Sequence, residues 1–264
     1  MGNHRKCVWV GAIAAILSGP ALAADLPPVI EPPVVAPIQD FSGWYIRGDI
    51  SYDVIDSDSA DYTGSNFPGQ FFNDDWDEAV NIGAGVGYQF NRYFRTDITV
   101  DYRQTQYDAD AKCASHPAPC TVGGVAAPRN FTEESADASI WTAMANAYVD
   151  VAHWHGLTPY VGAGIGIAYI DVTDYEGETW DGTSFVATSF DDNDQVNFAA
   201  SLMAGFSYDI TEFLKVDAGY RYTYLGDIET GTNPLDTGPT SEAVVEWESM
   251  DMHEARLGIR YMIY

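Results

Sequence analysis

The stretch Val80-Asn81-Ile82-Gly83-Ala84-Gly85-Val86-Gly87-Tyr88-Gln89-Phe90 decides the fold. Apolar side chains occupy every second position, and glycine or a polar residue occupies each position between them. A repeat of two residues is the repeat of a β-strand, because successive side chains point to opposite faces of a sheet. The stretch therefore predicts a strand with one apolar face and one small or polar face.

The same alternation recurs seven more times, near residues 44–53, 94–103, 141–151, 161–169, 196–207, 214–224 and 254–263. Tight turns are expected near Asn91, His155 and Thr211, and long loops at 54–78, 107–137, 172–194 and 227–249. Short turns alternating with long loops are typical of bacterial outer-membrane barrels. The prediction is an all-β fold, an eight-stranded antiparallel up-and-down transmembrane β-barrel over residues 41–264.

The charged residues of the polar face distinguish between two predictions, a membrane barrel and a soluble barrel of the lipocalin kind. Seven basic and seven acidic residues are expected on it: Arg47, Asp49, Asp53, Arg95, Asp97, Asp101, Arg103, Asp150, Lys215, Asp217, Arg221, Glu254, Arg256 and Arg260. A balanced set suits a narrow lumen, where each buried charge needs a partner. The opposite face is almost free of charge, as contact with lipid requires.

Aromatic residues are expected near both ends of the strands, as in the two girdles of membrane barrels. The predicted girdle residues are Trp44, Phe90, Phe94, Tyr160, Phe206 and Tyr261 at the turns, and Tyr52, Tyr102, Trp141, Tyr169 and Tyr224 at the loops.

The first 40 residues read as two non-barrel segments. Residues 1–23 combine Arg5 and Lys6, an apolar run and an Ala-Leu-Ala site, which predicts a secretory signal peptide. Residues 24–40 are rich in proline and are interpreted as an extended periplasmic leader. Cys113 and Cys120 follow in the exported part, where a disulfide is favoured over free thiols or a metal clip with His116. No metal site or cofactor is predicted.

Acidic charge dominates the chain, whose formal net charge is −27. Such a charge disfavours binding to nucleic acid, which needs basic patches. The four predicted loops carry 25 acidic residues and only two basic ones, Lys112 and Arg129. The runs Asp74–Glu78 and Asp191–Asp194 could hold divalent cations, although a solvated acidic surface is the favoured interpretation.

Three motifs resemble a known family: Gly43-Trp44-Tyr45, the strand opening Leu157-Thr158-Pro159-Tyr160-Val161-Gly162-Ala163-Gly164, and the ending Arg256-Leu257-Gly258-Ile259-Arg260-Tyr261. They resemble the small Gram-negative outer-membrane barrels of the OmpA-barrel and opacity-protein group, in the alphaproteobacterial form. One departure is that Ile263 holds the lipid-facing phase where such chains carry a final aromatic, and Tyr264 lies one position beyond.

The resemblance implies a place in the cell outer membrane, with extracellular loops and periplasmic termini. The implied partners are outer-membrane lipid, lipopolysaccharide, the barrel assembly machinery, and host or envelope molecules. The implied role is structural: envelope integrity and a surface antigen or adhesin.

A narrow porin for ions or small solutes is the alternative to a structural role, because the sequence does not reveal water-filled gaps in a charged lumen. A lipid-modifying enzyme is the third hypothesis. It would use His253, which faces lipid in the predicted register, but no serine, base and orienting group come together near it. The protein is therefore expected not to be an enzyme.

Overall fold

The computed structural model describes residues 42–63, 71–112, 121–122, 125–126, 131–180, 185–232 and 244–263. The predicted signal peptide and leader, Cys113, Cys120 and Tyr264 lie outside the described residues. No helix long and apolar enough to span a membrane occurs in the described part of the chain.

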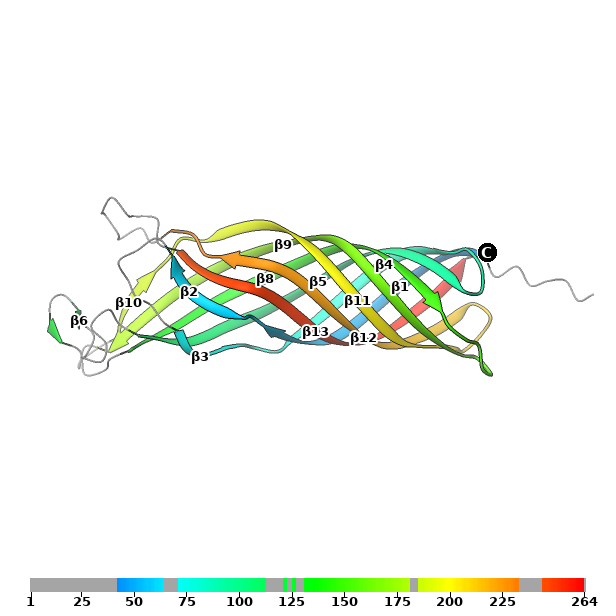
Figure 1. Ribbon diagram of the computed structural model, residues 1–264, viewed down its shortest axis with the longest axis horizontal. Coiled ribbons are helices and arrows are strands. Elements are labelled where there is room, and N and C mark those ends of the chain that lie inside the picture. Colours follow the sequence, from blue (N-terminus) through cyan, green and yellow to red (C-terminus); the bar gives the residue numbers. More distant parts are fainter. Residues whose placement is uncertain are drawn as a thin grey trace, which may run out of the picture. The chain divides into compact units, whose positions relative to one another are not determined.

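Eight long strands form a closed ring (Figure 1). They are β1 (Gly43–Asp56), β4 (Ala79–Gln89), β5 (Phe94–Lys112), β8 (Phe131–Asp150), β9 (Leu157–Trp180), β11 (Asn193–Asp209), β12 (Leu214–Glu229) and β13 (Val244–Ile263). Each pairs antiparallel with the next, and β13 pairs with β1 from Trp44↔Ile263 to Asp56↔Asp251, which closes the barrel. The predicted eight-stranded up-and-down barrel is confirmed.

Five shorter strands complete the described part: β2 (Ser59–Thr63), β3 (Phe71–Trp76), β6 (Thr121–Val122), β7 (Val125–Ala126) and β10 (Phe185–Ser189). Strand β2 pairs with β13, β3 with β5, and β10 with β9. All three therefore extend the wall of the barrel at one end, opposite to the end where β13 finishes (Figure 1).

The tight turns define what we call the turn end of the barrel, where β1 also begins and β13 finishes. Asn91 Oδ1 accepts hydrogen bonds from the backbone N–H groups of Tyr93 and Phe94. Thr211 Oγ1 does the same for Phe213 and Leu214. Polar side chains that bond to the backbone nearby stabilise such turns, and this explains why the sequence located them correctly. The opposite end is called the loop end.

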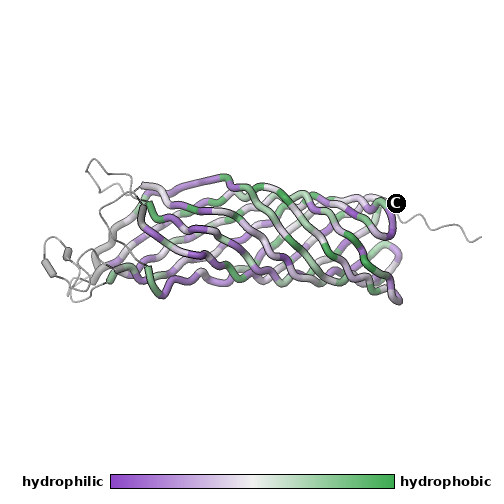
Figure 2. The backbone as a smooth tube through the Cα atoms, viewed as in Figure 1, coloured by the Kyte–Doolittle hydropathy of each residue, from purple (hydrophilic) through white to green (hydrophobic). Residues whose placement is uncertain are grey.

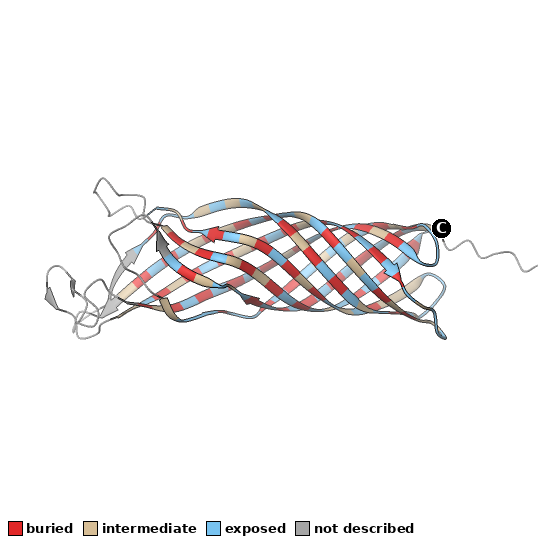
Figure 3. Ribbon diagram, viewed as in Figure 1, coloured by how far each residue is buried: buried red, intermediate tan, exposed pale blue. Residues whose placement is uncertain are grey.

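Side chains alternate between the interior and the exterior along every long strand (Figure 3). In the half of the barrel at the turn end, the outward residues are large and apolar and form what we call the outer belt, from Trp44 to Val54 on β1 and from Val149 to Trp141 on β8. Along the tube, apolar and polar residues follow one another in the same alternation (Figure 2). The outer belt has the character that lipid contact requires.

Strands extend far into the segments that were expected to be loops. Strand β5 runs to Lys112, β8 starts at Phe131, and β9 runs to Trp180. Beyond the outer belt they form what we call the collar, made of residues 55–63, 71–79, 104–112, 131–140, 170–180, 193–195, 225–229 and 244–252. The loop boundaries taken from the sequence were therefore wrong, most of all on β9, which continues from residue 172, where a loop was expected to begin, to Trp180.

The physical reason is an exchange of polarity between the two faces. From Gln104 to Ala111 the period of two continues, but Tyr107, Ala109 and Ala111 now point inward and Asp108 and Asp110 point outward. A search for apolar residues on the outer face ends where this exchange begins. The collar instead has a dry inside and a polar outside, the pattern of a barrel wall in water.

Two places in the collar lack the regular ladder between neighbouring strands. Pairing of β1 with β4 ends at Asp53↔Ala79. Pairing of β11 with β12 ends at Ala200↔Tyr224, and beyond this point side-chain amides reach across to the backbone of β12. The Nδ2 of Asn197 donates to the carbonyl of Asp227 at 2.6 Å, and the Nε2 of Gln195 donates to the same carbonyl at 2.8 Å. We call this boundary the amide seam.

Candidate functional site

The turn half of the lumen is filled by paired charges. The guanidinium of Arg47 holds Asp49 through Nε (2.8 Å) and Nη2 (2.6 Å) and holds Asp97 through Nη1 (2.8 Å). Arg221 holds Glu254 in the same bidentate manner, at 2.7 and 2.6 Å, and reaches Asp101 at 3.2 Å. Two-point pairing between a guanidinium and a carboxylate is both strong and geometrically specific.

Two more arginines join these pairs into one central group. Arg256 Nη2 lies 3.2 Å from Asp101 and 3.5 Å from Asp49. Arg103 Nη1 lies 3.0 Å from Asp53 and 3.7 Å from Glu254. The side chains of Asp53, Asp101 and Glu254 are 0% exposed, so the arginines replace water as the partners of these carboxylates.

The two remaining arginines lie between the central group and the turn end. Arg95 Nε lies 3.2 Å from Asp150, and its guanidinium stacks over the rings of Tyr148 and Tyr160 at 4.0 and 4.7 Å. Tyr160 was expected in the outer girdle, but it is 9% exposed and points inward, because the alternation that places Val161 outward turns Tyr160 to the lumen.

Arg260 Nη2 pairs with Asp217 at 3.1 Å and donates to Ser207 Oγ at 2.8 Å. Of the fourteen charged residues predicted to share the lumen, the structure places thirteen there. Lys215 instead lies half-buried and pairs with Asp209, a residue next to the Thr211 turn that the sequence analysis did not include.

A small cavity lies among these charges. A cavity of about 10 Å³ is lined by residues that include Arg47, Asp49, Asp217 and Arg256. That is close to the minimum volume that one water molecule needs.

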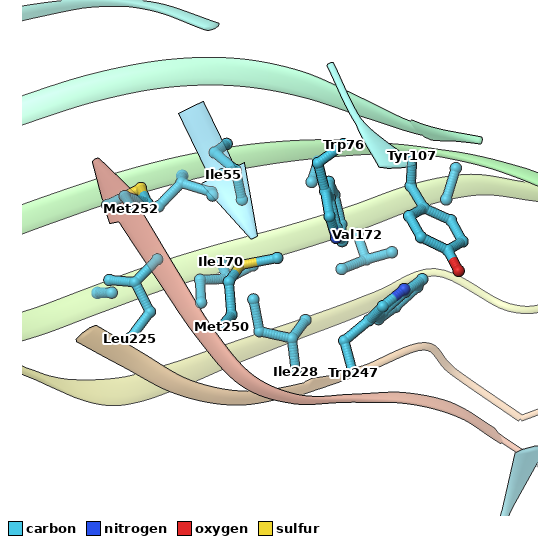
Figure 4. Packing of buried hydrophobic residues seen from close by; sticks show 14 of the residues in the cluster. Ile55, Trp76, Tyr107, Ile170, Val172, Leu225, Ile228, Trp247, Met250 and Met252 are labelled. Carbon is cyan, nitrogen blue, oxygen red and sulfur yellow. The ribbon is translucent and has the colours of Figure 1, made fainter. Parts of the chain in front are cut away.

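The loop half of the lumen has the opposite chemistry. Its side chains form what we call the apolar cluster: Ile55, Ala60, Trp76, Ala79, Tyr107, Ala109, Ala136, Ala138, Ile140, Met144, Ala168, Ile170, Val172, Tyr175, Phe190, Ala199, Leu225, Ile228, Val245, Trp247, Met250 and Met252. Most of them come from the ring strands, while Ala60 comes from β2, Trp76 from β3, and Phe190 directly follows β10. The close-up shows Trp76, Tyr107, Trp247 and their neighbours gathered in one cluster (Figure 4).

The border between the two chemistries is abrupt. Met252 belongs to the apolar cluster, and its Sδ lies 2.7 Å from Nη1 of Arg103, which belongs to the charged group. One inward step along β13 separates Met252 from Glu254. The lumen is thus divided into a charged compartment and an apolar one that meet at a single layer.

Three buried aromatic rings make up the centre of the apolar cluster. The ring centroids of Trp76 and Tyr107 lie 5.0 Å apart, those of Trp76 and Trp247 5.3 Å, and those of Tyr107 and Trp247 5.0 Å. The indole Nε1 of Trp76 forms no hydrogen bond with the residues that the structure describes. We call Trp76, Tyr107 and Trp247 the aromatic trio.

The outer surface of the collar is acidic. Partial burial, with the carboxylates of Asp227 and Glu229, raises the pKa of Glu246. Partial burial, with Asp77 and Asp137, raises the pKa of Asp108. Among the residues with described positions, no group of three or more His, Cys, Asp or Glu side chains has a metal-binding arrangement, and this includes the runs Asp74–Glu78 and Asp191–Asp194.

His253 faces outward from β13, and its Nδ1 shares a short hydrogen bond with Tyr220 Oη. Its ring also lies against Tyr222, with centroids 5.4 Å apart. These contacts describe a histidine held in an aromatic girdle by two tyrosines.

The sequence analysis missed the apolar cluster and the aromatic trio altogether. The signal that marks them is the inverted alternation, for example at Val245-Glu246-Trp247-Glu248, where every second residue is acidic and the apolar residues between are buried. A stretch in which apolar residues alternate with acidic ones has the composition of a loop. Only the register of the strand shows that its apolar side chains are buried.

Comparison with known proteins agrees with this architecture. A protein of Brucella suis without an assigned function is 35% identical over 233 residues, which cover 83% of this chain and 81% of the relative. A putative adhesin of Rickettsia canadensis is 26% identical over 161 residues, covering 57% of this chain and 66% of the relative. The crystal structure of the outer-membrane protein OprG from Pseudomonas aeruginosa superposes with a TM-score of 0.51 at 13% identity, covering 85% of this chain and 98% of OprG.

The family model described as outer membrane protein beta-barrel domain matches residues 12–261, almost the whole chain. With a closed ring of eight antiparallel strands and an apolar outer belt, the chain belongs to the outer-membrane β-barrel family and is a protein of the cell outer membrane.

Proposed function

We propose that this protein is a closed, non-enzymatic outer-membrane barrel that acts at the cell surface through its collar, as a binding protein of the adhesin type. The observation that carries the proposal is the filled lumen. The charged compartment holds thirteen paired side chains, and the apolar cluster follows it toward the loop end, so the described part of the wall encloses packed side chains rather than an aqueous path.

The orientation belongs to the proposal. The loop end would face outside, and the turn end, where β1 begins and β13 finishes, would face the periplasm. Short periplasmic turns and long outer connections are the general rule for bacterial barrels. The outer belt would then contact phospholipid and lipopolysaccharide, after insertion by the barrel assembly machinery.

The collar would supply the binding surface. Its outward positions carry many carboxylates, among them Asp108, Asp137, Asp171, Glu229 and Glu248. A surface of one charge attracts a partner of the opposite charge and accelerates their encounter, more weakly as salt rises. The expected partner is therefore a basic surface on a host or envelope molecule, and the named adhesin among the relatives agrees with such a role.

A narrow porin is the alternative function. It needs a continuous aqueous path, whereas the charged compartment offers a cavity with room for about one water molecule. Ions would also have to cross the apolar cluster, which offers no hydration.

Planar-bilayer conductance of the folded full chain tests the closed lumen. We expect no channel steps in a membrane in which a known porin gives clear ones. Reproducible steps that change when Arg221 is replaced would overturn the closed barrel and favour the porin.

Binding by intact cells tests the surface role. A deletion strain that carries the wild-type protein should bind a cationic host-cell surface better than the same strain carrying Asp108→Asn, Asp137→Asn and Asp171→Asn together. The matched control replaces Asp209 and Glu212 at the turn end with amides, and it should bind like wild type. Equal binding by all three strains would contradict the proposal.

A further inference from the structure

A groove crosses the outer belt near the turn end. It has a volume of about 800 Å³, and its lining includes outward residues of β1, β4, β5, β8 and β9. Small side chains form its floor: Thr96, Ala147 and Ala163 lie side by side on three neighbouring strands, and Ala145 follows on β8. Larger side chains stand beside this floor, so the surface of the outer belt is hollowed here.

The walls of the groove are stiff. The rings of Trp44 and Tyr88 pack edge to face, with centroids 5.3 Å apart, and form the wall on β1 and β4. Toward the loop end, Ile98 and Ile165 stand on either side of Ala145. Aromatic and β-branched side chains have little conformational freedom to lose, so the groove exists before anything enters it.

The outer belt faces lipid, so the occupant of the groove comes from the membrane. A second barrel would present a convex wall, which would rest on Trp44 and Ile165 and leave the floor at Ala147 uncovered. A lipid acyl chain is a narrow, flexible rod that fits along β8 between Ile98 and Ile165. It gains no hydrophobic free energy by leaving bulk lipid, so its preference for the groove comes from close packing against the floor and both walls.

Charge at the turn end favours a phosphate head on this chain. The tight turn that directly follows Phe90 carries the exposed Arg92, and the turn between β8 and β9 carries His153 and His155. Neither turn contains an acidic residue, whereas the turn between β11 and β12 contains Glu212. A basic side chain near the membrane surface attracts anionic lipid heads.

We propose that this groove binds one anionic phospholipid, with an acyl chain over Ala145, Ala147 and Ala163 and the phosphate beside Arg92. The lipid belongs to the leaflet at the turn end. The site goes beyond the surface role proposed above and does not depend on it. Only the identification of that leaflet as the periplasmic one rests on the orientation given there.

Alanine methyl groups provide the test with an internal control. Ala147 lines the groove, whereas Ala218 is exposed on the outer belt at a similar distance from the turn end, on β12, which β9 and β11 separate from β8. The full chain, labelled with carbon-13 at its alanine methyl groups, is placed in phosphatidylcholine nanodiscs that contain a small share of phosphatidylglycerol with a nitroxide on one acyl chain. We expect the nitroxide to broaden the signals of Ala145, Ala147 and Ala163 severalfold more than that of Ala218.

Filling the groove should remove this difference. Ala147→Leu places a larger side chain on the floor, so the broadening of Ala145 and Ala163 should fall to the level of Ala218. Ala218→Leu adds the same bulk elsewhere on the outer belt and should leave the groove signals unchanged. Should Ala147→Leu fail to fold, Ala163→Leu fills the same floor, with Ala145 as the reporter.

The lipid head tests the part played by Arg92. Labelled phosphatidylglycerol should occupy the groove about fivefold more than equally labelled phosphatidylcholine at the same share of the lipid, which is the preference that one basic residue at the membrane surface provides. Arg92→Gln should remove this preference and leave the contact of the acyl chain with Ala147 in place. Lys215→Gln, on β12, is the matched control and should leave the preference unchanged.

Three results would overturn the proposal. Equal broadening of Ala147 and Ala218 would mean that the groove contacts only bulk lipid. Groove signals that ignore the labelled lipid but shift with the number of barrels in each nanodisc would assign the groove to a second copy of the chain. Equal occupancy by the two labelled lipids in the wild-type protein would remove the anionic head and the role of Arg92.

Discussion

The two halves of the lumen share one wall and have opposite contents. In the turn half, an apolar exterior encloses Arg47, Arg221 and their carboxylate partners. In the loop half, an acidic exterior encloses Ile170, Trp247 and their apolar neighbours. The same strands pass through both halves without losing their alternation, so the solvent outside the wall decides which face carries the apolar residues. Lipid outside permits a charged interior, and water outside requires a dry one.

The largest effect should come from unpairing a charge in the turn half. Arg221→Met leaves Glu254 and Asp101 buried without their main partner, and we expect a loss of about 3–5 kcal/mol in the free energy of unfolding. Urea unfolding in bilayers, followed by the gel shift of the folded barrel, measures it. Adding Glu254→Gln to Arg221→Met should recover part of the loss. An effect no larger than that of Arg92→Met, at the exposed Asn91 turn, would contradict the role of pairing.

A smaller effect is expected from a cavity in the loop half. Ile170 is 0% exposed and belongs to the apolar cluster, whereas Ile167 on the same strand is 53% exposed on the outer belt. Ile170→Ala should cost about 2–5 kcal/mol, and Ile167→Ala should cost clearly less, because lipid fills the space that the lost side chain leaves. The same unfolding assay compares them. Equal losses would show that the interior of the collar is packed no more tightly than the contacts between the outer belt and lipid.

Substitutions in the amide seam should cost less free energy of unfolding than substitutions in the charged compartment or the apolar cluster. Asn197→Ala removes the hydrogen bond to the carbonyl of Asp227, which Gln195 still satisfies in part, so we expect a loss of about 1 kcal/mol. Faster limited proteolysis of the collar, with the outer belt still protected, would reveal it. Gln104→Ala removes an exposed amide elsewhere in the collar and serves as the control. Identical digestion of both variants would contradict a role for the seam.

Acidification should produce the smallest effect, and it should favour folding. The raised pKa values of Glu246 and Asp108 mean that the folded collar binds protons more tightly than the unfolded chain does. Charge on these groups therefore destabilises the collar above the raised pKa, and stability increases as the pH falls through it toward the ordinary carboxyl range. The thermal midpoint should rise slightly between neutral and mildly acidic pH, and less so in a Glu246→Gln and Asp108→Asn variant. A midpoint that falls over this range would contradict the assignment.

The sequence was sufficient to predict the strands of the turn half, because the strand period, the turn residues and the apolar face that lipid requires all indicate the same strands there. The run from Val80 to Phe90 and the turns at Asn91 and Thr211 are local signals. Even the interior partners could be listed, since buried charges must balance. The pairing itself could not be predicted, as with Lys215, because it depends on the stagger between strands far apart in the chain.

The loop half was not predictable by the same reasoning because its two faces exchange character. The residues of the aromatic trio lie on β3, β5 and β13, so only the closed ring brings them together. Tyr160 shows the same limit on a smaller scale, since one position in register separates a girdle residue from one that stacks on Arg95.

The amide seam makes the stiffness of the barrel wall uneven around its circumference. A peptide ladder fixes the spacing of two strands rigidly, whereas Asn197 and Gln195 hold β12 through rotatable side chains. Thermal breathing of the collar should therefore be larger along the line that runs from Ala200 toward the loop end between β11 and β12 than along the continuous ladders. The backbone amide protons beside this line should exchange with solvent faster than their counterparts on β5 and β8, whose ladder continues unbroken to Lys112↔Phe131.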